Sequence, residues 1–234
     1  MGFRAVFFDA GETIVYPHPS FPELLAQILR QAGHEIDPTV IREKVHVVAD
    51  IFTNAASEGE LWSTSPERSR RFWDRVYGRL LGELRVPFGE SLASAIYATF
   101  TDVANYRLFP DVMATLDRLR AAGLRLGVVS NFEEWLERLL ESLGVTAYFD
   151  VRVISGVEGV EKPDPKIFRL ALERMEASPE ESVYVGDSPQ FDVEPATSVG
   201  MTGVLLDRRG RFPGHRGPRI TSLDELPDVL GLAA

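Results

Sequence analysis

The chain of 234 residues contains no cysteine and few lysines, and both scarcities limit what it can be. Without cysteine it forms no disulfides and no thiolate metal sites. No apolar run reaches the roughly 18 residues that a membrane-spanning helix needs. The only lysines are Lys44, Lys162 and Lys166, so each of them is a candidate functional residue.

The chain also lacks an excess of positive charge. Asp and Glu outnumber Lys and Arg by 35 to 25, which gives a net charge of −10. Nucleic-acid-binding proteins usually present a basic patch, so no nucleic-acid partner is expected, and the acidic surface favours solubility. The first ten residues lead a short apolar stretch into an acid, which predicts a strand and not a signal peptide. We therefore expect a cytoplasmic protein without a membrane partner.

The order of the predicted elements indicates an α/β protein with an insertion. Residues 4–8 form a short apolar run of β type, whereas residues 20–103 carry four helical patterns with no strand between them. Strands and helices alternate in the remainder of the chain, which is typical of a doubly wound, mostly parallel sheet. The sequence thus predicts a Rossmann-like core of residues 1–15 and 107–234 and an inserted α-helical bundle of residues 16–106.

Helix starts in the insertion carry capping signals. Ser20 is followed three residues later by Glu23, the capping-box pattern, and Asp37 precedes a proline, the residue favoured at the first helical position. The pattern over residues 37–52 predicts one uninterrupted helix. Aromatic residues of the insertion, among them Trp62 and Trp73, are interpreted as the packed interior of the bundle and not as a substrate site.

Polar side chains follow several of the predicted strands. Ligands of doubly wound sheets bind at the carboxyl ends of the strands, near the point where the strand order reverses. Side chains that end strands, or follow them closely, are therefore expected to meet at one edge of the sheet. The residues that this rule brings together are Asp9, Ser130, Asn131, Lys162, Asp187 and Asp192.

Three carboxylates at one place repel one another unless a cation lies among them. A hard divalent ion with oxygen ligands, Mg²⁺ above all, suits Asp9, Asp187 and Asp192. The ion and Lys162 would make a positive pocket beside Asp9, and such a pocket, with the Ser130 hydroxyl, suits a phosphoryl group. Because carboxylates can act as nucleophiles that form an aspartyl-phosphate, the residues predict phosphoryl transfer in which Asp9 attacks.

Four segments together resemble the motifs of the haloacid dehalogenase superfamily. FFDAGET, VVSN, EKPDP and VGDSPQFD occur in order and with the typical spacing. The resemblance covers residues 1–14 and about 107–234, and the inserted bundle resembles the small helical cap of this superfamily in position and helical content. It implies a hydrolase with Mg²⁺ as cofactor and a small phosphorylated metabolite as substrate. We expect a monomer or a homodimer.

The resemblance also implies roles for single residues. Asp9 is the nucleophile and a metal ligand, and the Ser130 hydroxyl binds phosphate with Asn131 beside it. Lys162 is the cation that orients Asp9 and substrate. Asp187 is a metal ligand, and Asp192 supports the metal or its waters.

The chain departs from the superfamily pattern at residue 11. Phosphatases of this type usually have a second Asp there, in the pattern D-x-D-G-T, which protonates the leaving group and then activates water. Here Gly11, Glu12 and Thr13 follow one another. The Gly11 carbonyl can still ligate the metal, as this position does in the superfamily. A missing general acid/base costs about 10²- to 10⁴-fold in rate.

Three interpretations of this departure stay open. The protein is a slow phosphatase that favours good leaving groups such as aryl or acyl phosphates, or Glu12 replaces the missing Asp, or the pocket binds phosphate without turnover and serves regulation. Two related chemistries fit less well. The dehalogenases of the superfamily use no metal and lack the paired acids after the fourth strand. Phosphonate hydrolases need a lysine from the cap, where Lys44 is the only one, and its neighbours Arg42, Glu43 and His46 indicate a solvated helical face.

Overall fold

The computed structural model describes residues 2–232, and the chain divides into two compact units. One unit takes in the chain up to Val15 and from Leu108 onward, and the other is Tyr16–Arg107. The chain passes between them in β2 (Val15–Pro17) and β3 (Tyr106–Leu108), which pair as a two-stranded ribbon. Among the described residues, no helix combines the length and apolarity that a membrane crossing requires.

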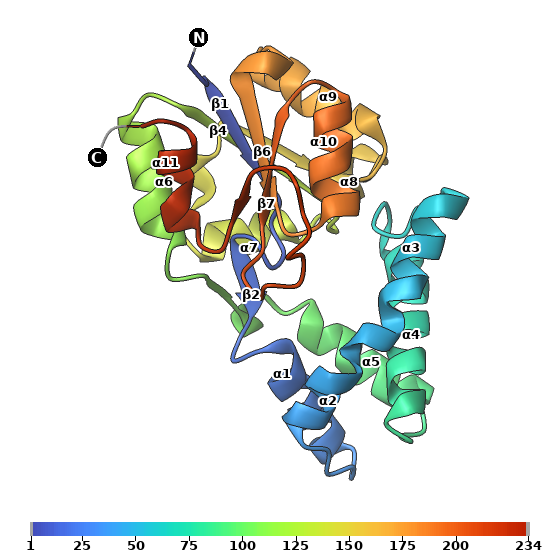
Figure 1. Ribbon diagram of the computed structural model, residues 1–234. Coiled ribbons are helices and arrows are strands. Elements are labelled where there is room, and N and C mark those ends of the chain that lie inside the picture. The colour runs from blue at the N-terminus through green and yellow to red at the C-terminus, as the bar shows by residue number, and fades with distance from the viewer. Residues whose placement is uncertain (1, 233–234) are drawn as a thin grey trace. The chain divides into compact units, whose positions relative to one another are not determined.

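Six parallel strands form the sheet of the larger unit (Figure 1), in the order β5-β4-β1-β6-β7-β8. Their bounds are β1 (Ala5–Phe8), β4 (Arg125–Ser130), β5 (Val151–Ile154), β6 (Ser182–Gly186), β7 (Thr202–Leu206) and β8 (Arg219–Ile220). The predicted doubly wound sheet is thereby confirmed. Because later strands are added on both sides of β1, the strand order reverses there, and this is where such sheets bind ligands.

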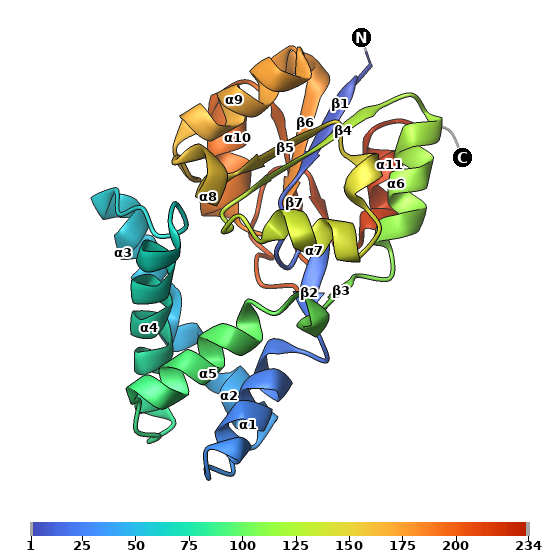
Figure 2. The ribbon, with the colours of Figure 1, turned by 180° about the vertical axis from the view of Figure 1, so that it is seen from behind.

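Helices cover both faces of this sheet, as Figures 1 and 2 show. Those of the unit are α6 (Val112–Ala121), α7 (Leu136–Ser142), α8 (Ser155–Glu158), α9 (Pro165–Met175), α10 (Glu194–Ser198) and α11 (Leu226–Val229). Helices α9 and α10 pack on one face, and α6 with α11 lies on the other. A strand covered on both faces must be apolar throughout, which is why all four residues of β1 are buried.

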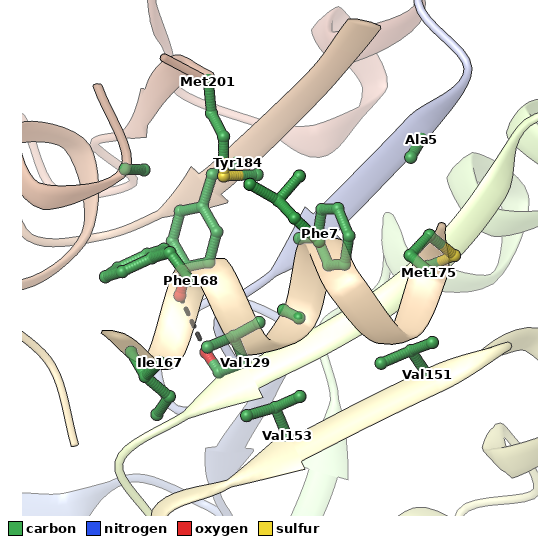
Figure 3. Close-up of a cluster of buried hydrophobic side chains, with 13 residues drawn as sticks. Ala5, Phe7, Val129, Val151, Val153, Ile167, Phe168, Met175, Tyr184 and Met201 are labelled. Carbon is green, nitrogen blue, oxygen red and sulfur yellow. Dashed lines mark hydrogen bonds between the residues drawn. The ribbon is translucent and has the colours of Figure 1, made fainter. Parts of the chain in front are cut away.

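The face under α9 holds a close-packed cluster (Figure 3). Phe7 from β1 and Tyr184 from β6 lie against Phe168 and Met175 of α9, and all four are almost fully buried. The rings of Phe168 and Tyr184 meet edge to face with centroids 4.9 Å apart. Burying one such side chain contributes about 1.5–3 kcal/mol, so this cluster holds the central strands in register beneath the helix.

The smaller unit contains five α-helices among its described elements. They are α1 (Phe21–Gln31), α2 (Pro38–Lys44), α3 (Ala49–Glu58), α4 (Pro66–Glu83) and α5 (Glu90–Phe100). The predicted N-caps are present, since Ser20 accepts a hydrogen bond from the Glu23 amide at 3.4 Å and Asp37 accepts one from the Thr39 amide at 2.7 Å.

The prediction of a single helix over residues 37–52 is wrong. Helix α2 ends at Lys44, a 3₁₀ turn follows at Val45–Val48, and α3 begins at Ala49. Three valines fall within this turn. Their branched side chains lose rotamer freedom against the preceding helical turn, so the apolar periodicity continued where the local propensity for α-helix was weakest.

Aromatic rings form the interior of the smaller unit. Trp62 stacks on Phe72 with centroids 5.0 Å apart, Phe52 meets Phe72 edge-on at 5.0 Å, and Trp73 stacks on Tyr77 at 5.7 Å. Trp62 and Phe72 are buried. Trp73 is half-buried. The interpretation of these aromatics as bundle interior is therefore confirmed for Trp62, and the absence of a substrate contact stays a prediction.

Candidate active site

The predicted nucleophile lies at the carboxyl edge of the sheet, between two neighbouring strands. Asp9 follows β1 directly, and its backbone N–H donates to the Val185 carbonyl of β6 at 2.9 Å. Ser130 is the last residue of β4, on the other side of β1, and its hydroxyl donates to Asp9 Oδ1 at 2.9 Å. The two strands that flank β1 therefore fix both the backbone and the side chain of Asp9.

A buried lysine joins two of the acids. Lys162 Nζ lies 2.7 Å from Asp9 Oδ1 and 2.5 Å from Asp192 Oδ1. The exposed fractions of these three side chains are 4, 9 and 2%. In such an environment charges interact far more strongly than at the surface, and removing the lysine would leave two buried carboxylates without their counter-ion.

Asn131 holds the loop that carries this lysine. Its side-chain oxygen accepts from the Lys162 amide at 2.7 Å, and its side-chain nitrogen donates to the Lys162 carbonyl at 2.8 Å. Both polar ends of the Asn131 amide are thus used on one residue. Asn131 therefore positions Lys162 in this structure, and its predicted contact with substrate stays a prediction.

Asp192 reaches the site from a π-helical turn at Pro189–Val193, a geometry that is frequent at functional sites. Its Oδ2 accepts from the Ser188 amide at 2.9 Å. Gly186, at the end of β6, makes room for the carboxylate, because a Cβ on Gly186 would lie 2.3 Å from Asp192 Cγ. Residue 186 must therefore be glycine for the Asp192 carboxylate to lie this close to the backbone of β6.

Sequence reasoning missed Tyr184 as a site residue. Its hydroxyl donates to the Val129 carbonyl at 2.7 Å, the bond drawn in Figure 3, and lies 3.1 Å from Lys162 Nζ and 3.2 Å from Asp192 Oδ1. The side chain is fully buried, and burial, together with the charges of Asp192 and Asp9, holds the pKa of the phenol well above its usual value. Tyr184 therefore supports the lysine from the core side as a neutral hydroxyl.

Asp187 follows β6 and completes a cluster of three acids. One carboxylate oxygen from each of Asp9, Asp187 and Asp192 lies within 4.8 Å of the other two. Three hard oxygen donors at this separation fit Mg²⁺, which prefers carboxylate and water ligands. Gly11 lies in the tight turn after Asp9, where it bridges to Val15, and its carbonyl stays the predicted fourth protein ligand.

Burial and mutual repulsion shift the pKa values of these groups. Burial, followed by the charges of Asp192 and Asp9, raises the pKa of Asp187 to about 7. Burial also raises the pKa of Asp192, although Lys162 opposes it. Burial lowers the pKa of Lys162, but the attraction of Asp192 and Asp9 outweighs that effect and leaves this pKa above its usual value. The three acids thus carry more negative charge than Lys162 can neutralise.

Arg211 is a second residue that sequence reasoning missed. Its Nη2 donates to Asp187 Oδ2 at 2.8 Å. It comes from the loop after β7, outside the four motifs, and the only sequence signal is the density of arginines in DRRGRFPGHRG.

Glu12 lies outside the cluster of three acids. Its backbone is left-handed, with φ 57°, a conformation that glycine adopts freely and other residues rarely do. Its carboxylate accepts a hydrogen bond from Arg209 Nη2 at 2.5 Å. Arg209 thus holds the Glu12 carboxylate, and proton transfer by Glu12 stays a prediction.

Comparison with known proteins identifies relatives that match nearly the full length of this chain. The family described as "Hydrolase: haloacid dehalogenase-like hydrolase" matches residues 3–200. Haloacid dehalogenase-like hydrolase domain-containing protein 3 of Danio rerio is 30% identical over 236 residues, which cover 96% of this chain and 95% of that protein. Glyceraldehyde 3-phosphate phosphatase of Methanopyrus kandleri is 33% identical over 236 residues, with 96% and 91% covered.

A solved structure shares the fold. The HAD-hydrolase YfnB of Bacillus subtilis superposes with a TM-score of 0.78, covering 99% of this chain and 100% of that one, at 18% sequence identity. This likeness concerns the arrangement of the strands and helices. The identities of the site residues come from the chain itself.

Proposed function

The chain belongs to the haloacid dehalogenase-like hydrolase family, and from this premise we propose that it is a Mg²⁺-dependent phosphatase acting on small phosphorylated metabolites. The observation that carries the proposal is the setting of Asp9, whose Oδ1 accepts from both Lys162 and Ser130 at 2.7 and 2.9 Å. Two donors on one oxygen orient the carboxylate before substrate arrives, and such preorganisation lowers the barrier to attack. The phosphatase relative from Methanopyrus kandleri supports the reaction class.

In the proposed reaction, Asp9 attacks the phosphorus of the substrate. The bond from phosphorus to the leaving oxygen breaks as the bond to the Asp9 carboxylate forms, and water then cleaves the aspartyl-phosphate to free phosphate and restore Asp9. Lys162, whose positive charge is stabilised by Asp9 and Asp192, would offset the charge of the phosphoryl oxygens. Mg²⁺ held by Asp9, Asp187, Asp192 and the Gly11 carbonyl would supply further charge neutralisation at the phosphoryl group.

Residue 11 decides which substrates the site favours. Gly11 has no side chain to protonate a leaving group, and the Glu12 carboxylate is bound to Arg209. Leaving groups that need little protonation, such as those of acyl and aryl phosphates, should therefore depart faster than alkyl alcohols. We expect glyceraldehyde 3-phosphate, the substrate in the name of one relative, to be hydrolysed more slowly than an acyl phosphate.

A substrate panel tests the proposed function. Acetyl phosphate, para-nitrophenyl phosphate, glyceraldehyde 3-phosphate and a 2-haloacid are each incubated with Mg²⁺ and with EDTA, using the wild type and Asp9→Asn. We expect Mg²⁺-dependent phosphate release that is fastest from the acyl and aryl esters, none from the variant, and no halide release. Asparagine matches aspartate in shape, so the variant keeps the fold while its amide is a very poor nucleophile.

Three outcomes would contradict the proposal. Full activity in EDTA would show that the reaction needs no metal ion. Wild-type rates from Asp9→Asn would show that Asp9 forms no covalent intermediate. Tight binding of inorganic phosphate without turnover of any ester identifies a phosphate-binding protein instead.

A further inference from the structure

The contact between Arg211 and Asp187 has no place in the reaction described above. Arg211 Nη2 lies 2.8 Å from Asp187 Oδ2, and the side chains are 49% and 22% exposed. The arginine therefore reaches in from the rim, whereas Lys162 lies in the interior beneath Asp9. Two cations, one buried and one half-exposed, accompany the three acids.

The loop that carries Arg211 is fastened by a buried acid. Asp207 follows β7 and is only 1% exposed. Its carboxylate accepts from the backbone amides of Arg211 and Phe212 at 2.7 and 2.9 Å and from Arg219 Nε at 3.0 Å. The backbone of residue 211 is thus held in place, while its long side chain extends to Asp187.

The guanidinium and a metal ion would use the same carboxylate. Without a metal ion, Lys162 binds Asp9 and Asp192, and Arg211 supplies a second positive charge at Asp187, the third acid. With a divalent ion among the acids, that charge is no longer needed and the two cations repel each other. We propose that Arg211 binds Asp187 as a counter-ion in the metal-free protein and leaves it when Mg²⁺ binds, so that it weakens the affinity for Mg²⁺.

This inference rests on the proposed metal site, and calorimetric titration with Mg²⁺ tests the two separately. Wild type, Arg211→Gln, Arg216→Gln and Asp187→Asn are titrated at pH 8 and 0.15 M salt, without substrate. Arg216 is a matched control because it is an exposed arginine of the same loop and its removal changes the net charge equally. Thermal melting of each variant checks that the fold is intact.

We expect Arg211→Gln to bind Mg²⁺ roughly three- to tenfold more tightly than wild type. This factor corresponds to losing an interaction whose strength lies between that of an exposed ion pair and that of a charged hydrogen bond. Arg216→Gln should stay within about twofold, since salt screens charges that are not in contact. Unchanged or weaker binding by Arg211→Gln overturns the inference, and weaker binding would show that Arg211 orients Asp187 as a ligand. Absence of binding by wild type, or undiminished binding by Asp187→Asn, overturns the metal site as well.

Discussion

Restoring the usual acid/base at residue 11 should raise the rate on alkyl phosphates. The double change Gly11→Asp with Glu12→Gly rebuilds the pattern D-A-D-G-T and places a carboxylate two residues beyond Asp9. A Cβ on Gly11 would meet only the Phe132 ring among other residues, at 3.6 Å, which is an ordinary van der Waals contact. The site therefore has room for the first atom of the new side chain.

The second substitution should leave stability nearly unchanged. Glu12 has a left-handed backbone with φ 57°, which costs an ordinary residue about 1–2 kcal/mol, and glycine removes that strain. Two losses oppose the gain: about 0.4–1 kcal/mol from the freer unfolded chain and up to about 1 kcal/mol from the exposed pair with Arg209. These terms cancel to within about 1.6 kcal/mol, so the melting temperature should move by no more than about 6 °C.

The assay compares glycerol phosphate with para-nitrophenyl phosphate at saturating Mg²⁺. We expect the double variant to hydrolyse the alkyl ester at least about tenfold faster, which is about 1.4 kcal/mol in the barrier. This gain is below the roughly 10²- to 10⁴-fold of an established general acid/base, because the residues around position 11 are not adapted to a carboxylate there. The aryl ester should gain less, because its leaving group needs little protonation. Glu12→Gln is the control, and it should be silent if Glu12 transfers no proton.

The reasoning is refuted by either of two results. If Glu12→Gln alone slows hydrolysis about tenfold and the double variant gains nothing, Glu12 already transfers the proton. If the control is silent and the folded double variant is no faster on any ester, the slow step lies elsewhere than at residue 11.

Three further perturbations follow from the site. Because the pKa of Asp187 is raised to about 7, Mg²⁺ affinity measured by calorimetry should rise about tenfold from pH 6 to pH 8, and an affinity that does not change with pH would contradict the raised pKa. Without Mg²⁺, the same carboxyl group stabilises the fold at low pH and loses that contribution as the pH rises through 7. Gly186→Ala forces a Cβ against the Asp192 carboxylate and should destabilise by about 1–3 kcal/mol in urea and weaken Mg²⁺ binding, whereas Gly82→Ala, in open space within α4, should do neither. Tyr184→Phe takes one hydrogen-bond partner from the Val129 carbonyl and from the Lys162 ammonium and should destabilise by about 1–3 kcal/mol in the same assay. A variant as stable as wild type would show that Tyr184 does not support Lys162.

The strands and their polar ends could be predicted because each depends on a few consecutive residues. An apolar run that meets Asp9 or Asp187 indicates both a buried strand and its end. The rule that parallel strands present their carboxyl ends together then predicts that these side chains meet. The observed cluster of Asp9, Asp187 and Asp192 agrees with that expectation.

Contacts made by side chains of ambiguous character could not be predicted in the same way. Tyr184 resembles one more apolar residue of a strand, and its hydroxyl matters only because the side chain reaches across β1 to Val129 of β4, 55 residues away in the chain. Arg211 comes from a loop that no periodicity or motif describes, and its contact depends on the turn built around buried Asp207. The end of helix α2 at Lys44 could not be predicted, because the helical spacing of apolar residues continued through residues with weak helical propensity.

Rapid acid quenching during hydrolysis of para-nitrophenyl phosphate with Mg²⁺, followed by mass spectrometry of proteolytic peptides, tests the covalent mechanism most directly. Acyl phosphates survive acid long enough for the modified peptide to be identified and sequenced. The account predicts one phosphoryl group on the peptide that contains Asp9, formed with the first burst of nitrophenolate and absent from Asp9→Asn. Phosphate release with Asp9 unmodified at every quench time, or a phosphoryl group on another residue, would contradict it.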